Sequence, residues 1–177
     1  GANPMKLGLD LRGGIHFLLD VDVDDMLKQR TQADVRSMGG ELRQAGIRYS
    51  AIRVLNGDKG LQIQFAKQSD RDSAISELSK DYPSYQLTPM GQTGDLSLQA
   101  VMLPSEVIKL KQSAVQQNLN ILRTRVNELG VAEPRIAQQG ADKISVDLPG
   151  IQDMARAKSL LGKVASLQMR LVDTEHD

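Results

Sequence analysis

The stretch IHFLLDVD, residues 15–22, predicts the first strand of the fold. Every second residue in it is apolar, and these residues are Ile15, Phe17, Leu19 and Val21. Alternation with a period of two is typical of a strand that buries one face and exposes the other. The fold therefore contains a sheet with at least one face packed on a core.

The residues that follow predict a helix, a hairpin, a second helix and a further strand. Gly46 ends the first helix, and Asn56-Gly57 is a strong local signal for the turn of the hairpin. The element order up to this point is βαββαβ. The expected ranges are a helix over 24–45, strands over 49–55 and 61–65, a helix over 70–80 and a strand starting at 85.

The same order of elements is predicted again in the second half of the chain. Pairs such as Gly57 and Gly140, or Ile63 and Val146, are separated by the same 83 positions, which favours a structural repeat. The expected ranges are a strand over 96–102, a helix over 105–129, strands over 135–139 and 143–148, a helix over 153–161 and a strand over 164–172.

These patterns predict an α+β protein made of two ferredoxin-like βαββαβ lobes. Such a unit places two helices on one face of a four-stranded antiparallel sheet. The expected division is a linker over 1–14, a first lobe over 15–92 and a second lobe over 95–173. Exchange of strands between the two lobes remains an open alternative.

Composition narrows the classes of function. The 177 residues contain 22 Lys and Arg against 22 Asp and Glu, so the formal net charge is zero. Binding to nucleic acid or to an anionic membrane surface usually requires a basic excess, and we expect no nucleic-acid partner. The sequence contains no apolar run of about 20 residues, the length that a membrane helix requires.

Catalytic and metal-binding patterns are weak. The acidic run over 20–25 begins like a calcium loop, but Asp25 and Thr31 stand where that loop needs Gly and Glu. The two histidines, His16 and His176, are far apart in the sequence, and there is no cysteine to complete a zinc site. No phosphate-binding, dinucleotide-binding or nucleophile-elbow motif is present. We therefore expect no enzyme activity, no cofactor and no metal.

Two glycine-containing features remain to be explained. Gly13-Gly14 precedes the first strand, and Pro149-Gly150 follows the strand over 143–148. Glycine allows a sharp turn or a close approach of another segment. The alternatives are a simple turn into the first strand and a close packing joint against another part of a larger protein.

At these residues the sequence resembles the SecD family of preprotein-translocation accessory subunits. LGLDLRGGIHF, residues 7–17, is similar to the signature that follows the first membrane helix in that family. VQQNLNILRTRVNELGVAEP, residues 115–134, resembles its long helix and turn, and DLPGIQD, residues 147–153, resembles the segment after its second hairpin.

The resemblance implies a function in protein export. It implies the membrane-proximal base of a large periplasmic domain in a bacterial inner-membrane protein, working with SecF beside the SecYEG channel. Such a base would pass movement, driven by the proton gradient, between membrane helices and a head that binds translocating unfolded polypeptide. The proton-carrying carboxylates of the family lie in membrane helices, so no catalytic residue is implied here.

The resemblance also indicates coupling residues and a second way to pair the strands. Asp10, Arg12, Gly13 and Gly14 are the candidates for coupling membrane helices to the sheet. In an extended segment Asp10 and Arg12 share one face and can form charge-assisted hydrogen bonds. Shorter relatives imply that residues 24 to about 94 are an inserted module, which would pair the first strand with the second half of the chain.

Two other classes of function remain open on the sequence. A tandem ferredoxin-like regulatory domain would bind a small ligand where the two lobes meet. An acylphosphatase-like enzyme would use Arg12.

Overall fold

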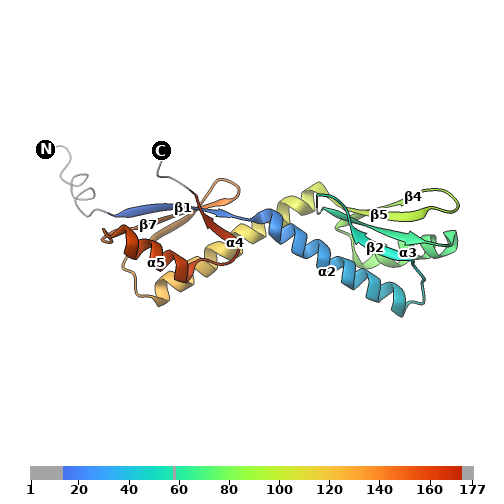
Figure 1. Ribbon diagram of the computed structural model, residues 1–177, viewed down its shortest axis with the longest axis horizontal. Helices are drawn as coiled ribbons and strands as arrows, with labels where there is room; N and C mark the ends of the chain where they lie inside the picture. Colours follow the sequence, from blue (N-terminus) through green and yellow to red (C-terminus); the bar gives the residue numbers. More distant parts are fainter. Residues whose placement is uncertain (1–13, 58, 173–177) are drawn as a thin grey trace. The chain divides into compact units, whose positions relative to one another are not determined.

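The computed structural model describes residues 14–57 and 59–172, which form an α+β fold with two sheets (Figure 1). Each sheet has four strands, and all neighbouring strands are antiparallel. The chain divides into two compact units: unit 1 comprises residues 1–23 and 111–177, and unit 2 comprises residues 24–110. The predicted α+β class with two four-stranded lobes is confirmed.

Unit 1 is built on sheet A, whose strand order is β6-β7-β1-β8. Its elements follow the chain order βαββαβ and are β1 (Ile15–Val21), α4 (Pro104–Glu128), β6 (Arg135–Gln139), β7 (Lys143–Leu148), α5 (Met154–Val164) and β8 (Met169–Leu171). The N-terminal part of α4, up to Leu110, belongs to unit 2.

One face of sheet A packs against α4 and α5, which lie on the same side of the sheet in Figure 1. The alternation in β1 buries Phe17, Leu19 and Val21, as the sequence predicts. The helices meet them with residues at helical spacing, which are Val115, Leu119, Leu122 and Val126 from α4 and Ala157, Leu161 and Val164 from α5. Burial of these apolar side chains is the main source of stability in unit 1.

Unit 2 is built on sheet B, whose strand order is β2-β3-β5-β4. Its elements are α2 (Val23–Gln44), β2 (Ala51–Val54), β3 (Gly60–Phe65), α3 (Gln68–Asp81), β4 (Tyr85–Met90) and β5 (Leu96–Met102). Its core combines Leu27, Met38 and Leu42 of α2 with alternate residues of β3 and β5, among them Ile63 and Leu98. The first and last residues of β3 and β7 are both separated by 83 positions, the offset found in the sequence.

β1 and β5 are the first strands of the two predicted lobes, and each lies in the sheet that was predicted for the other. β1 lies between β7 and β8 in sheet A, and β5 lies between β3 and β4 in sheet B. The two units therefore differ from the division into 15–92 and 95–173, and residues 24–110 form a module inserted between β1 and most of α4. The alternatives of strand exchange and of an inserted module describe this arrangement.

The β4–β5 hairpin explains the exchange. Only residues 91–95 separate the two strands, and Gly91 and Gly94 adopt the positive φ angles that the turn requires. Closing so short a loop costs less conformational entropy than bringing β1 to the same position across the intervening elements. β5 fills the central position of sheet B, and β1 fills the equivalent position of sheet A.

None of the helices in the described part of the chain combines the length and the apolar character needed to cross a membrane.

Candidate functional site at one end of sheet A

The candidate site lies where the chain enters β1. The antiparallel register places Ile15 opposite Leu148 and His16 opposite Asp147. Gly14 therefore reaches the Pro149-Gly150 segment that leaves β7. The two glycine-containing features singled out in the sequence meet here, and we call this place the β1–β7 joint, defined by Gly14, His16, Asp147 and Pro149.

The space around Gly14 in the joint is tight for any larger residue. A Cβ atom added at Gly14 would lie 3.0 Å from the Cα of Pro149 and 3.3 Å from the carbonyl oxygen of Leu148. Both neighbours are backbone atoms, which cannot swing aside as a side chain can. This contact lies within the chain, so a packing joint of the glycine pair against another part of a larger protein stays a prediction.

The segment after β7 ends the strand pairing and turns the chain toward α5. Pro149 has no backbone N–H group, so it cannot donate to the ladder. Gly150 has a φ angle of 88°, which favours glycine, and Asp153 caps α5 by accepting a hydrogen bond from the backbone N–H of Ala155. The segment therefore ends β7 and leads into α5, and Pro149 also lies against Gly14.

His16 and Asp147 form a polar pair on the face of sheet A opposite the helices. His16 Nδ1 lies 2.5 Å from Asp147 Oδ1, and the two side chains are 54% and 44% exposed. Because both groups are open to solvent, the pair contributes little to stability. The contact places the imidazole beside the joint.

A cavity of about 200 Å³ opens at the joint, and its lining includes Gly14, His16, Asp147, Pro149 and Arg135 of β6. A second, larger hollow of about 520 Å³ shares Pro149 and lies toward α5. Its lining combines the apolar Val131, Ile151 and Leu160 with the basic Arg156 and Lys163.

The lining of the joint combines charged, polar and backbone groups. The described lining of the cavity offers a cation, Arg135, and the imidazole–carboxylate pair of His16 and Asp147. Of the candidates from the sequence, Gly14 lies in the joint, whereas Asp10, Arg12 and Gly13 lie outside the described residues. His16, Arg135 and Asp147 were not predicted as site residues, because their proximity follows only from the pairing of β1 with β7 and of β7 with β6.

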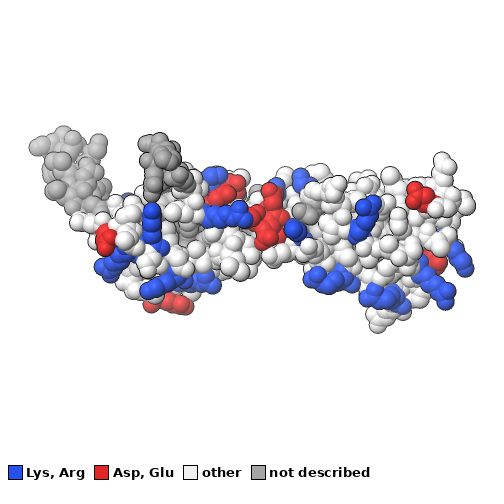
Figure 2. All heavy atoms as spheres, viewed as in Figure 1, with Lys and Arg blue, Asp and Glu red and all other residues white. Residues whose placement is uncertain are grey.

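The acidic run over 20–25 is accounted for by ion pairs and a helix start. Asp20 lies 3.7 Å from Lys143 Nζ, and Asp22 lies 2.8 Å from an Arg170 nitrogen. Asp24 and Asp25 stand in the first turn of α2, where the helix dipole favours negative charge. On the face drawn in Figure 2, basic and acidic side chains are interspersed with uncharged areas.

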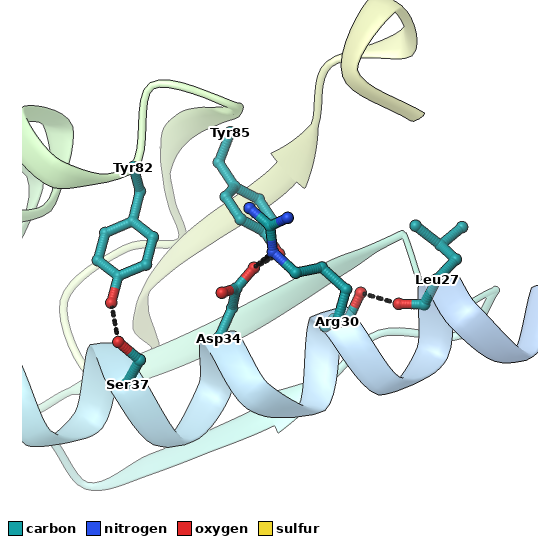
Figure 3. Close-up of polar contacts among 7 residues, drawn as sticks. Leu27, Arg30, Asp34, Ser37, Tyr82 and Tyr85 are labelled. Atoms are coloured by element: carbon teal, nitrogen blue, oxygen red, sulfur yellow. Dashed lines mark hydrogen bonds and ion pairs between the residues drawn. The ribbon is translucent and has the colours of Figure 1, made fainter. Parts of the chain in front are cut away.

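Unit 2 contains a buried polar network that fastens α2 to β4 (Figure 3). Asp34 Oδ2 accepts hydrogen bonds from Tyr85 Oη at 2.5 Å and from Arg30 Nε at 3.0 Å. Burial, followed by the hydrogen bond and the negative charge of Asp34, raises the pKa of Tyr85 well above its ordinary value. The phenol therefore keeps its proton and acts as the donor. Figure 3 also shows the hydroxyl groups of Ser37 and Tyr82 in contact.

A group of three carboxylates lies between α2 and α3. Oxygen atoms of Glu41, Glu77 and Asp81 lie within 4.8 Å of one another. A hydrogen bond with Asp81, burial and the negative charges of Asp81 and Glu77 together raise the pKa of Glu41 to about 7. Two carboxylates can share such a bond only when one of them carries the proton.

Comparison with known proteins relates the joint to a family. The family model "SecD/SecF GG Motif" matches residues 1–25, and "Protein translocase subunit SecDF, P1 domain, N-terminal" matches residues 115–174. The first contains all of β1, and the second contains all elements of unit 1 from β6 onward. Most of unit 2 lies between the two matched ranges.

Individual relatives match nearly the whole chain. Protein translocase subunit SecD of Escherichia coli (strain K12) is 49% identical over 176 residues, which are 99% of this chain and 28% of the relative. SecD of Haemophilus influenzae is 43% identical over 174 residues, or 98% of this chain and 27% of the relative. SecD of Pseudomonas aeruginosa is 39% identical over 171 residues, or 97% of this chain and 27% of the relative.

A glycine-pair motif entering a ferredoxin-like unit, together with these matches, defines a segment of a protein-translocase subunit of the SecD/SecF type. Within that class, the chain belongs to the SecD family. It spans between a quarter and a third of the length of the relatives that it matches.

Proposed function

We propose that this chain is the base of a periplasmic domain that carries movement between the membrane-embedded part of SecD and a polypeptide-binding head. It acts in export through the SecYEG channel, together with SecF, and the proton gradient drives the movement. The chain contributes no catalytic group, since its role is to transmit force. The match to the SecD P1 domain and to the SecD/SecF motif supports this assignment.

The close contact between Gly14 and Pro149 is the observation that carries the proposal. A coupling segment must be joined tightly to the element that it moves. Pro149 Cα lies 3.0 Å from the position of a Cβ atom at Gly14, so the last glycine of the matched motif packs closely on the segment that leaves β7. The core of unit 1 begins one residue later, at Ile15.

Substitutions in the rest of the motif test the coupling function. In the full-length protein, Arg12→Ala and Gly13→Val should slow the export of a secreted reporter at least about tenfold, with the level of SecD unchanged. Pulse-chase processing of the reporter measures export, and immunoblotting measures SecD. Export at the normal rate in both variants would refute the coupling function.

A further inference from the structure

Asn56 and Gly57 lie next to each other in the connection between β2 and β3. Both residues are exposed, and Gly57 has a φ angle of 91°. The backbone N–H of Leu55 donates to the carbonyl oxygen of Gly60 at 2.9 Å, which closes the base of the connection. Within residues 14–57 and 59–172, no group forms a hydrogen bond with the side chain of Asn56 or with the backbone N–H of Gly57.

These two residues have the chemistry for an internal cyclisation. The side-chain amide carbon of asparagine, Cγ, is an electrophile, and the backbone nitrogen of the next residue can close a five-membered ring on it. Glycine favours this reaction, because it has no side chain to crowd the nitrogen. No atom beyond the adjoining residues lies within 4 Å of a Cβ atom added at Gly57, so the surroundings leave room for the ring.

The other asparagines in the described part of the chain lack these conditions. Asn118, Asn120 and Asn127 lie in α4, where the next residue carries a side chain and its backbone N–H is hydrogen-bonded within the helix. Asn118 is also buried, and its side chain donates to the carbonyl oxygen of Ala114 at 2.8 Å. Asn120 and Asn127 are exposed, so exposure alone does not distinguish Asn56 from them. The turn and the glycine that follows do.

We propose that Asn56 is a site of spontaneous modification, where the side-chain amide is lost and isoaspartate or aspartate takes its place. The backbone nitrogen of Gly57 gives its proton to the solvent and attacks Cγ of Asn56. As the new C–N bond forms, the side-chain nitrogen leaves as ammonia. Water then opens the succinimide ring: breaking the bond from nitrogen to Cγ gives aspartate, and breaking the bond from nitrogen to the main-chain carbonyl carbon gives isoaspartate.

Formation of isoaspartate at this position should weaken the pairing of β2. In isoaspartate the main chain runs through the side-chain carbons, so the turn gains a carbon atom, and the register of a hairpin depends on the length and type of its turn. β2 is an edge strand whose only neighbour is β3, so nothing on its other side holds it in the sheet. The modification therefore acts on unit 2, and the inference does not depend on the coupling function.

Ageing of the 177-residue chain at neutral pH and physiological temperature tests the inference. Peptide mapping by mass spectrometry measures the loss of the amide at each asparagine, and enzymatic methylation of isoaspartate identifies the product. Asn56 should react within about threefold of its rate in a peptide of the same sequence, because exposed groups without hydrogen bonds react without unfolding. Asn118, Asn120 and Asn127 should react at least about tenfold more slowly than Asn56.

Asn56→Gln should remove most of the signal, because glutamine would have to close a less favourable six-membered ring, whereas the control Asn120→Gln should leave it unchanged. In the modified chain, the amides of residues 51–54 should exchange with solvent at least about tenfold faster than in the fresh chain, with those of β5 unaffected. An unmodified Asn56, or equal rates at Asn56 and Asn120, would overturn the inference. Unchanged exchange of residues 51–54 in the modified chain would overturn the effect on β2.

Discussion

The carboxyl group of Glu41 makes the stability of unit 2 depend on pH. Its pKa is about 7 in the folded chain, against an ordinary value of 4.5. Between these two values the folded state binds a proton that the unfolded state releases. The contribution of Glu41 to the free energy of unfolding is therefore greatest below about pH 5, falls as pH rises through 7 and levels off above about pH 8.

Glu41→Gln should remove this dependence, because the amide cannot ionise. The variant should unfold like the wild type at pH 5 and should be more stable at pH 8 by on the order of 1 kcal/mol, after allowance for solvent screening. Urea denaturation at the two pH values measures the difference. The exposed Glu128→Gln serves as the control, and a wild-type chain as stable at pH 8 as at pH 5 would contradict the shared proton.

Single residues also show what the sequence could not predict. The glycine pair and Pro149-Gly150 could be recognised as special because glycine and proline restrict the backbone in known ways. His16, Arg135 and Asp147 carry no such signal, since charged and polar residues alternate along any exposed strand face. Their proximity follows from strand register, which no local pattern specifies here.

At the scale of elements, the attachment of α2 to β4 depends on the buried bond between Asp34 and Tyr85. Asp34→Ala leaves the phenol of Tyr85 buried with its main acceptor removed, which should destabilise the chain by about 1–3 kcal/mol. Tyr85→Phe removes the same bond from the other side. The double variant should lose less stability than the sum of the two single losses, and the difference, the coupling energy, should be about 0.5–3 kcal/mol in urea denaturation.

Ser37→Ala is the matched control for this cycle. It removes the exposed contact of α2 with Tyr82, so its effect should remain within about 0.5 kcal/mol. Additive effects of Asp34→Ala and Tyr85→Phe would mean that the bond does not fasten the two elements.

The elements themselves were well predicted from sequence, and their pairing was not. Periodicity located β1, the β2–β3 and β6–β7 hairpins and the long helices to within a few residues. A strand or helix that buries one face repeats its apolar residues at a fixed spacing, and this spacing is visible in the sequence. β1 and β5 are both seven-residue strands with the same alternation. The sequence of β1 or of β5 would therefore suit the central position of sheet A or of sheet B. The short β4–β5 connection places β5 in sheet B, which leaves sheet A to β1.

For the whole molecule, the exchange of strands predicts which fragment folds. Residues 24–110 contain every strand of sheet B and both of its covering helices, so this fragment should be folded and should unfold cooperatively in urea. Residues 15–92 lack β5, the neighbour of β4, and they also lack β7 and β8, the neighbours of β1. This fragment should therefore not unfold cooperatively. Circular dichroism of both fragments measures this, and the opposite result would refute the exchange.

The two units differ in which comparisons match them. Both family models fall on unit 1 apart from the last residues of the first match, whereas the SecD relatives align through unit 2 as well. The joint at Gly14 lies in unit 1, so we assign the proposed coupling function to that unit.

The most direct test of the coupling function compares two glycines in full-length SecD. Gly14→Ala places a methyl group 3.0 Å from the Cα of Pro149, so the backbone there must shift slightly, whereas Gly162→Ala adds a methyl group to α5 with no contact within 4 Å beyond its chain neighbours and the helix's own backbone. With both variants present at wild-type levels, export of a secreted reporter should slow at least about tenfold in Gly14→Ala and remain normal in Gly162→Ala. Normal export in Gly14→Ala would contradict the account.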